Sequence, residues 1–287
     1  MLLLLLASTE AQAPTPQWQW GETPVRYVSE MSMVAGFPLW FLARENNEAR
    51  GGEFQMKLAM SCVGQGKKII EVTCEIDHAK LSGVAVDAKK QDMLNAVFAE
   101  YEETYESATL VLEMDTTGRI KRVDLEGPVR STSREASVIE RQRQLATRLV
   151  APLDIQFPKD GNISEAWKQK GSPIAMQLLS TSGTAGGVRL MHEVASTHGS
   201  MLNFISTGQA TTITGSDVEN GANNTVSLML SGQGSFDTAS GQLVRNEQVL
   251  TGVPTAQNLT KVFNSDYINQ RVVVQRVDGF DGYEWAK

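Results

Sequence analysis

The chain has 287 residues, of which 41% are hydrophobic and 21% are charged, values typical of a folded protein with a substantial core. It has 26 Lys and Arg residues against 33 Asp and Glu residues, giving a net charge of −7, and its basic residues form only isolated pairs such as Lys67-Lys68. This charge balance argues against nucleic acid as a partner.

The N-terminus has the pattern of a secretory signal peptide. A short apolar run, Leu2–Leu6, precedes Ala11-Gln12-Ala13, which fits the small-residue cleavage pattern of signal peptidase. We expect residues 1–13 to be removed and residues 14–287 to be exported, to the periplasm or outside the cell. No Lys or Arg precedes the apolar run. The signal peptide could therefore be truncated, with its true start upstream, and the alternative is an N-terminus that is disordered or docked on the core. No later segment reaches the ~18 apolar residues of a membrane span, so we expect none.

The first predicted strand lies near residues 25–29 and is followed by the most apolar stretch of the mature chain, "VAGFPLWFLA". Two interpretations of this stretch are open. Its large side chains could line an apolar cavity or lie against a membrane surface, or they could fill the core, which is the commoner role of such clusters. The candidate ligand-binding residues are Phe37, Leu39, Trp40, Phe41 and Leu42.

The two cysteines, Cys62 and Cys74, lie in neighbouring segments with alternating apolar residues, "EFQMKLAMSCV" and "IIEVTCEI". Period-two alternation predicts two half-buried strands, with both cysteines on the inner face of a hairpin. In an exported protein we expect a disulfide. A tight turn at residues 64–66 would not place the cysteines opposite each other, whereas a turn centred near Lys68 would; two buried free thiols remain the alternative.

Two helices are predicted after this hairpin, and a shorter strand near residues 81–86 precedes the first. That helix runs from a cap at Asp87 to Tyr105, with an apolar stripe that includes Leu94 and Phe98, and an acidic face around Glu100. The second helix runs from a capping box at residues 132–135 to Val150, where Pro152 ends it. Its inward face is predicted to carry Val138, Gln142, Leu145 and Leu149. The following "LDIQFP" is predicted to be a short strand.

Two similar stretches, "LEMDTTGRIKRVDL" and "SFDTASGQLVRNEQVL", each place Asp-Thr after an apolar run. An aspartic protease would need Asp-Thr-Gly without interruption, whereas here Gly118 and Gly241 stand three and four residues after Asp115 and Asp237. Asp at the start and Gly near the end of a short connection are typical of hairpin turns. We therefore interpret both aspartates as turn residues.

From residue 183 onward the sequence alternates strand patterns with turns rich in Gly, Ser, Asn and Asp, and "MLNFIST" and "ATTITG" are predicted as two separate strands. Sequential strands with short turns predict an antiparallel meander. The whole pattern predicts an α+β fold: a large curved antiparallel β-sheet, half-barrel-like, with two main helices packed on one face. We expect a single domain over residues 14–287, with a candidate subdomain junction near residues 160–185.

No catalytic or metal-binding constellation is evident. "HEVASTH" places His192 and His198 six residues apart in a strand pattern, roughly 20 Å along an extended chain, so they cannot share a metal. We interpret His192 as a core histidine with satisfied hydrogen bonds. The sequence contains no G-x-S-x-G or S-x-x-K motif. We therefore expect no cofactor, no metal and no enzymatic activity.

Three stretches, "WGETPVRY", "TTGRIKRVDLEG" and "ERQRQLATRLVAPLDIQFP", resemble a family of uncharacterised exported proteins of Gram-negative bacteria. That resemblance implies export but no catalytic or binding residues. More loosely, the plan of many strands and few helices is similar to periplasmic lipoprotein carriers, in which a half-open antiparallel barrel holds acyl chains beneath a helical lid; this is similarity of fold alone.

These observations favour an exported, non-enzymatic protein that binds a hydrophobic ligand or lipid in the concavity of its sheet. The alternative is a structural or interaction module of the cell envelope, without a small-molecule ligand, that uses a sheet edge or the acidic helix face near residues 100–106. The sequence identifies no protein partner for either role.

Overall fold

The computed structural model describes residues 16–34, 53–83, 88–127, 133–161, 163, 165–170, 189–217, 222–254 and 268–286. The predicted signal peptide, the apolar stretch with Phe37, Leu39, Trp40, Phe41 and Leu42, and the predicted helix caps at Asp87 and Thr132 lie outside the described residues. No helix among the described residues is long and apolar enough to cross a membrane.

The described chain is dominated by strands, with two long helices in its first half. In order the elements are β1 (Val25–Val34), β2 (Glu53–Gln65), β3 (Ile69–Gly83), α1 (Ala88–Glu106), β4 (Thr109–Asp115), β5 (Ile120–Glu126), α2 (Ser133–Val150), the 3-10 turn η2 (Ala151–Leu153), β6 (Ala166–Lys170), β7 (Arg189–His198), β8 (Met201–Asp217), β9 (Ala222–Asp237), β10 (Gln242–Pro254), β11 (Ile268–Val277) and η3 (Glu284–Ala286).

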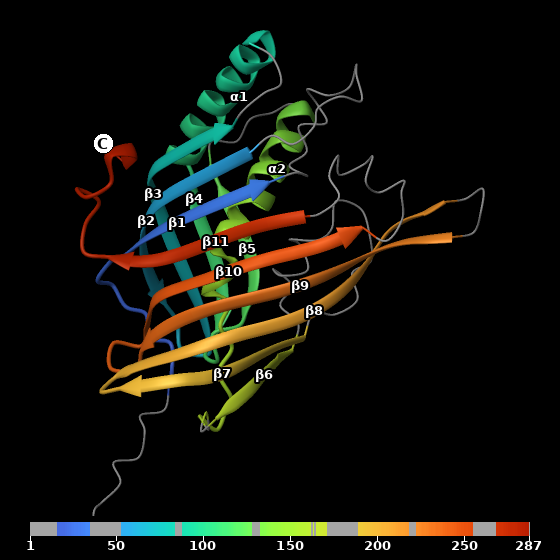
Figure 1. Cartoon of the computed structure of the whole chain (residues 1–287). Coiled ribbons are helices and arrows are strands. Elements are labelled where there is room, and N and C mark those ends of the chain that lie inside the picture. Colours follow the sequence, from blue (N-terminus) through green and yellow to red (C-terminus); the bar gives the residue numbers. More distant parts are fainter. Residues whose placement is uncertain are drawn as a thin grey trace, which may run out of the picture.

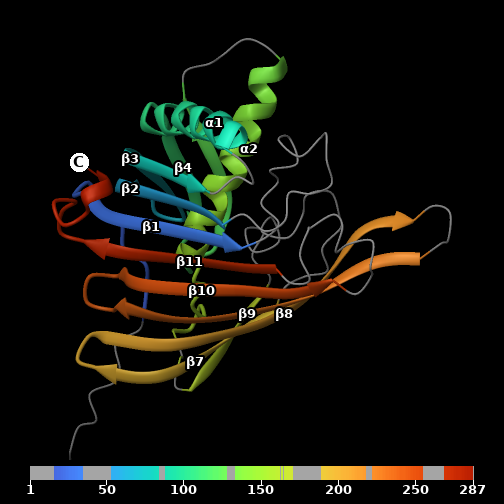
Figure 2. The same ribbon diagram turned by 45° about the horizontal axis from the view of Figure 1, so that its top comes forward.

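The eleven strands among the described residues form one antiparallel sheet in the order β5-β4-β3-β2-β1-β11-β10-β9-β8-β7-β6. The sheet curves strongly, because α2 contacts β5 at one edge and also β1 and β11, which lie four and five strands away. Figures 1 and 2 show β4 and β5 turned behind the plane of β1 and β11, with α2 on the inner side. The predicted α+β fold with a large curved antiparallel sheet is confirmed, and the core lies on this inner face.

The cysteine hairpin formed as predicted. Cys62 and Cys74 are paired directly opposite each other in the β2–β3 register and joined by a disulfide, with their Cα atoms 4.0 Å apart. The turn is centred on Lys68, because Gln65 pairs with Glu71 in the same register that pairs Cys62 with Cys74. The predicted inner-face residues of both strands are buried, namely Phe54, Met56, Leu58, Met60, Cys62, Ile70, Val72, Cys74 and Ile76.

The two Asp-Thr stretches are hairpin turns, as predicted. The Asp115 carboxylate accepts hydrogen bonds from the Thr117 amide and hydroxyl, and the Asp237 carboxylate accepts them from the Ala239 amide and the Ser240 hydroxyl. Gly118 has φ of 95°, and a Cβ at this position would lie 2.1 Å from Nε1 of Trp18. Only glycine fits there, for its conformation and for the close approach of the indole.

Three strand predictions were wrong. The strand predicted near residues 81–86 is the end of β3, which continues unbroken to Gly83. The two strands predicted within residues 201–215 are one, β8. The predicted strand at residues 153–158 is instead an irregular strap that pairs with no strand, because side chains satisfy its backbone: the carbonyls of Ile155 and Gln156 accept from the indoles of Trp18 and Trp167.

Helix α1 lies along the part of β3 that β4 leaves unpaired. Strand β4 pairs with β3 only as far as Glu75. Beyond that point, carboxylates of α1 replace the missing strand: Glu106 accepts from the Ala79 amide at 3.1 Å, and Glu102 accepts from the Leu81 amide at 2.7 Å. Part of the acidic face that the sequence marked as a candidate interaction surface therefore closes a sheet edge, which would otherwise present free backbone groups.

Replacing Glu102 by Ala is expected to lower the free energy of unfolding by about 1–2 kcal/mol, because the partly buried Leu81 amide would lose its charged acceptor. Urea unfolding followed by circular dichroism measures this change. Glu103→Ala is the matched control, since Glu103 is an exposed glutamate on the same helix. Equal stability of the two variants would show that the Glu102 contact does not support the edge.

Candidate functional site

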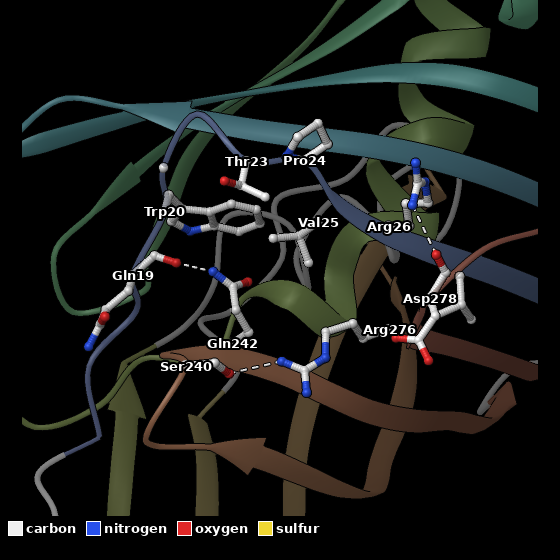
Figure 3. Close-up of a pocket in the computed structure, with 12 residues that line it drawn as sticks. Gln19, Trp20, Thr23, Pro24, Val25, Arg26, Ser240, Gln242, Arg276 and Asp278 are labelled. Carbon is white, nitrogen blue, oxygen red and sulfur yellow. Dashed lines mark hydrogen bonds between the residues drawn. The ribbon is translucent and has the colours of Figure 1, made fainter.

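An open pocket of about 540 Å³ lies at the end of the sheet where β1 begins and β11 ends. Three parts of the chain line it: residues from Gln19 to Arg26 other than Glu22, Ser240 just before β10 with Gln242 at its start, and the end of β11 around Arg276. Figure 3 shows Trp20 and Val25 on one side of the pocket and Arg276 on the other. Its walls therefore combine an aromatic surface with two guanidinium groups, those of Arg26 and Arg276.

Hydrogen bonds tie these three parts together. The Gln242 side chain donates to the Gln19 carbonyl and accepts from the Tyr27 hydroxyl at 2.8 Å. Nη1 of Arg276 donates to the Ser240 hydroxyl at 2.9 Å, and Arg26 donates to the Asp278 carbonyl at 2.9 Å (Figure 3). Complete burial of Tyr27 raises the pKa of its hydroxyl, which stays protonated as a donor.

The two guanidinium groups of this pocket suit contact with a polar or anionic group. The residues that line it include no His, Cys or Glu, so it holds none of the usual general bases other than Asp278. Both arginines already donate within the protein. Among the described residues, no group of three His, Cys, Asp or Glu side chains is placed to hold a metal ion.

The inner face of the sheet is organised in rows of side chains that run across the strands. In the first row, Ser29 of β1 pairs with Val274 of β11, and Val274 pairs in turn with Asn246 of β10. This row is covered by the end of α2 and by η2, because Ser29 donates to the Leu149 carbonyl at 2.7 Å and Asn246 donates to the Pro152 carbonyl at 2.7 Å.

Two further rows lie toward the end of β1. One runs Met31, Val272 and Gln248, and the next runs Met33, Gln270, Leu250 and Leu230. All of these side chains are buried. Five of the seven are apolar, so the two rows form a buried apolar layer on the inner face of the sheet, which also contains two amides.

A cluster of polar side chains around His192 lies on the inner face at β6, β7 and β8. Its Nδ1 lies 2.8 Å from the Ser206 hydroxyl and its Nε2 lies 2.9 Å from Oε1 of Gln169, while its ring stacks on Trp167 at 4.8 Å. Gln169 also donates to the Asp154 carbonyl at 2.9 Å, so the cluster holds the irregular strap in place. The prediction of a core histidine is confirmed.

Burial lowers the pKa of His192 to about 4. The unfolded chain binds this proton near pH 6.5, so between pH 6.5 and 4 the unfolded state holds more protons than the folded state, and stability must fall as the pH falls. We expect a loss of about 3 kcal/mol from His192 between pH 7 and pH 4.

Urea unfolding at a series of pH values measures this loss. His192→Gln should be less stable at pH 7 but should lack this component of the pH dependence. His198→Gln, at an exposed position on the same strand, should retain it. An unchanged pH profile in His192→Gln would contradict the assignment.

The structure describes only some of the residues that the sequence analysis singled out. It brings Cys62 and Cys74 together and assigns Asp115 and Asp237 to turns, whereas the five apolar candidates from Phe37 to Leu42 lie outside the described residues.

Sequence reasoning missed Arg148, which is buried on the inner side of α2. Its position in the last helical turn, where a cation is favourable, gave no reason to expect burial.

No family model matches the chain, and no curated protein sequence matches it. Its fold is similar to part of a solved structure of lipovitellin, determined in work on lipid–protein interactions in lipovitellin, with a TM-score of 0.51 and 8% sequence identity. The match covers 93% of this chain and 25% of the lipovitellin chain, so the protein spans about a quarter of that neighbour's length. At this identity the likeness concerns the fold alone: a large antiparallel sheet shared with part of lipovitellin.

Proposed function

We propose that the protein is an exported, non-enzymatic binding protein that holds a hydrophobic ligand or lipid on the concave face of its sheet. The observation that carries the proposal is the buried apolar layer formed by Met31, Met33, Val272, Leu250 and Leu230 on the inner side of a curved sheet that does not close. Ligand sites are typically lined by apolar side chains with a few polar groups among them, and this layer has that composition.

Two further findings support this proposal. The fold is similar to part of lipovitellin, a protein studied for its lipid–protein interactions. The Cys62–Cys74 disulfide is of a kind that persists in oxidising compartments, which supports export to the periplasm or outside the cell. We include Phe37, Leu39, Trp40, Phe41 and Leu42 in the proposed lining, since the chain enters this stretch directly from Val34 at the end of β1.

The test is native mass spectrometry of the protein purified from an exporting host, followed by solvent extraction and lipid analysis. The expected result is a species heavier than the protein, with an extractable apolar ligand. Leu230→Gln, on the inner face, should reduce the bound ligand. Met229→Gln is the matched control, because Met229 is its neighbour on the outer face and is 60% exposed. Protein-mass species alone, with no extractable lipid, would count heavily against the proposal.

A further inference from the structure

Arg148 is a buried cation without an acidic partner among the described residues. Its side chain is only 8% exposed, at the point where α2 meets β1. Its Nη1 lies 3.9 Å from the sulfur of Met33, a weak acceptor, and its Nε is buried with no hydrogen-bond partner. The arginines that form ion pairs in the described structure, such as Arg245 and Arg271, do so at the surface, with side chains 45% exposed.

This arrangement is energetically costly as it stands. An ionised group in a protein interior loses its hydration and is normally compensated by an opposite charge and by hydrogen bonds. Burial lowers the pKa of Arg148 to about 10, so the guanidinium is still charged at neutral pH. A positive charge that is buried and only weakly bonded favours the entry of an anion beside it.

The surroundings of Arg148 define the kind of anion. Met33, which the guanidinium touches, stands beside Gln270 on β11, and the same row continues to Leu250 and Leu230. Gln270 is 2% exposed, so its amide lies in the interior next to the apolar row. A charged group and an amide at one end of an apolar strip match a ligand with an anionic head and a hydrocarbon chain.

We propose that Arg148 binds the carboxylate of a single-chain amphiphile, such as a fatty acid, whose chain lies along Met33, Leu250 and Leu230. The planar guanidinium can donate two parallel hydrogen bonds to a carboxylate, which fixes the orientation of the head group. This inference rests on the proposed function and specifies its ligand class.

The test compares two fluorescent probes, cis-parinaric acid and its methyl ester, which share the same hydrocarbon chain and differ in the head group, an anionic carboxylate in one and a neutral ester in the other. Wild-type protein, freed of bound lipid by solvent extraction and refolded with its disulfide intact, is titrated with each. We expect the acid to bind about 10- to 100-fold more tightly than the ester, the range given by charge-assisted hydrogen bonds.

Variants of Arg148 test whether this residue causes the preference for the acid over the ester. Arg148→Met, similar in length but uncharged, should bind both probes with the affinity that the wild type has for the ester. Arg148→Lys should keep part of the preference. Arg271→Met is the matched control: it removes a positive charge next to Gln270 in sequence, at a surface ion pair, and should leave the preference intact. Thermal unfolding of each variant checks that it is folded.

The outcomes separate the two proposals. Equal binding of acid and ester by the wild type would overturn the role of Arg148 and leave the binding of apolar ligands standing. Binding of neither probe would overturn both. If Arg148→Met still prefers the acid, the assignment to Arg148 is overturned. The assignment is also overturned if Arg148→Met binds neither probe and has a markedly lower melting temperature, because Arg148 would then have a structural role. Preference for an alkyl phosphate over cis-parinaric acid would overturn the choice of carboxylate as the head group.

Discussion

Removing the disulfide, by Cys62→Ala together with Cys74→Ala, is expected to lower the free energy of unfolding by about 3 kcal/mol. The cross-link joins residues 12 apart in sequence and restricts the unfolded chain, and the chain-entropy relation gives this magnitude for so short a loop. Both cysteines are fully buried on the inner face, so the substitution also removes two sulfur atoms from the core.

Urea unfolding of the oxidised protein and of the double variant measures the effect, and the wild type with a reducing agent present is the control. Reduced wild type and double variant should unfold at similar urea concentrations, both well below the oxidised protein. A double variant as stable as the oxidised wild type would show that the hairpin is held by its strand pairing alone.

Replacing Trp18 by Ala is expected to have a similar or larger effect, a loss of about 3–5 kcal/mol. Trp18 is 2% exposed, its indole donates to the Ile155 carbonyl at 2.9 Å, and its ring stacks on Trp20 and meets Phe236 edge-on at 5.2 Å. It therefore joins the N-terminal segment to the strap and to β9. Its loss would leave a cavity and a buried carbonyl without its donor.

Trp18→Phe separates the two contributions, because it keeps an aromatic ring but removes the indole donor. We expect it to retain much of the packing and to lose about 1–2 kcal/mol. Gln17→Ala, at an exposed neighbouring position, is the control. Urea denaturation monitored by tryptophan fluorescence and by circular dichroism gives the values. A loss below about 1 kcal/mol for Trp18→Ala would mean that the N-terminal segment contributes little to the folded state.

Where the determinants are local, the sequence predicted the structure well. The alternation in residues 54–62 and 70–76 predicted the burial of every inner-face residue it named, because the side-chain period of a strand is fixed by its backbone. The positions of Asp115 and Asp237 before glycines predicted both turns, since a short carboxylate side chain bonds to backbone amides two residues on.

Predictions failed where the outcome depended on partners distant in sequence. Residues 153–158 have an apolar pattern that suits a strand, yet their hydrogen bonds go to Trp18, Thr117, Trp167 and Gln169, which no local pattern reveals. The interior of residues 201–215 looked like a break, but pairing with β7 on one side and β9 on the other keeps β8 continuous.

The sequence by itself determined the antiparallel plan, the pairing of the two cysteines in one hairpin and the turn role of the two aspartates, because each depends on the chain within a few residues. Only the tertiary structure decided which charges are compensated. Glu102 and Arg148 both sit on amphipathic helices, but curvature of the sheet places one carboxylate on a free strand edge and one guanidinium in the interior. Burial and the presence of a counter-charge are properties of the assembled sheet, and they direct the search for a ligand to Arg148.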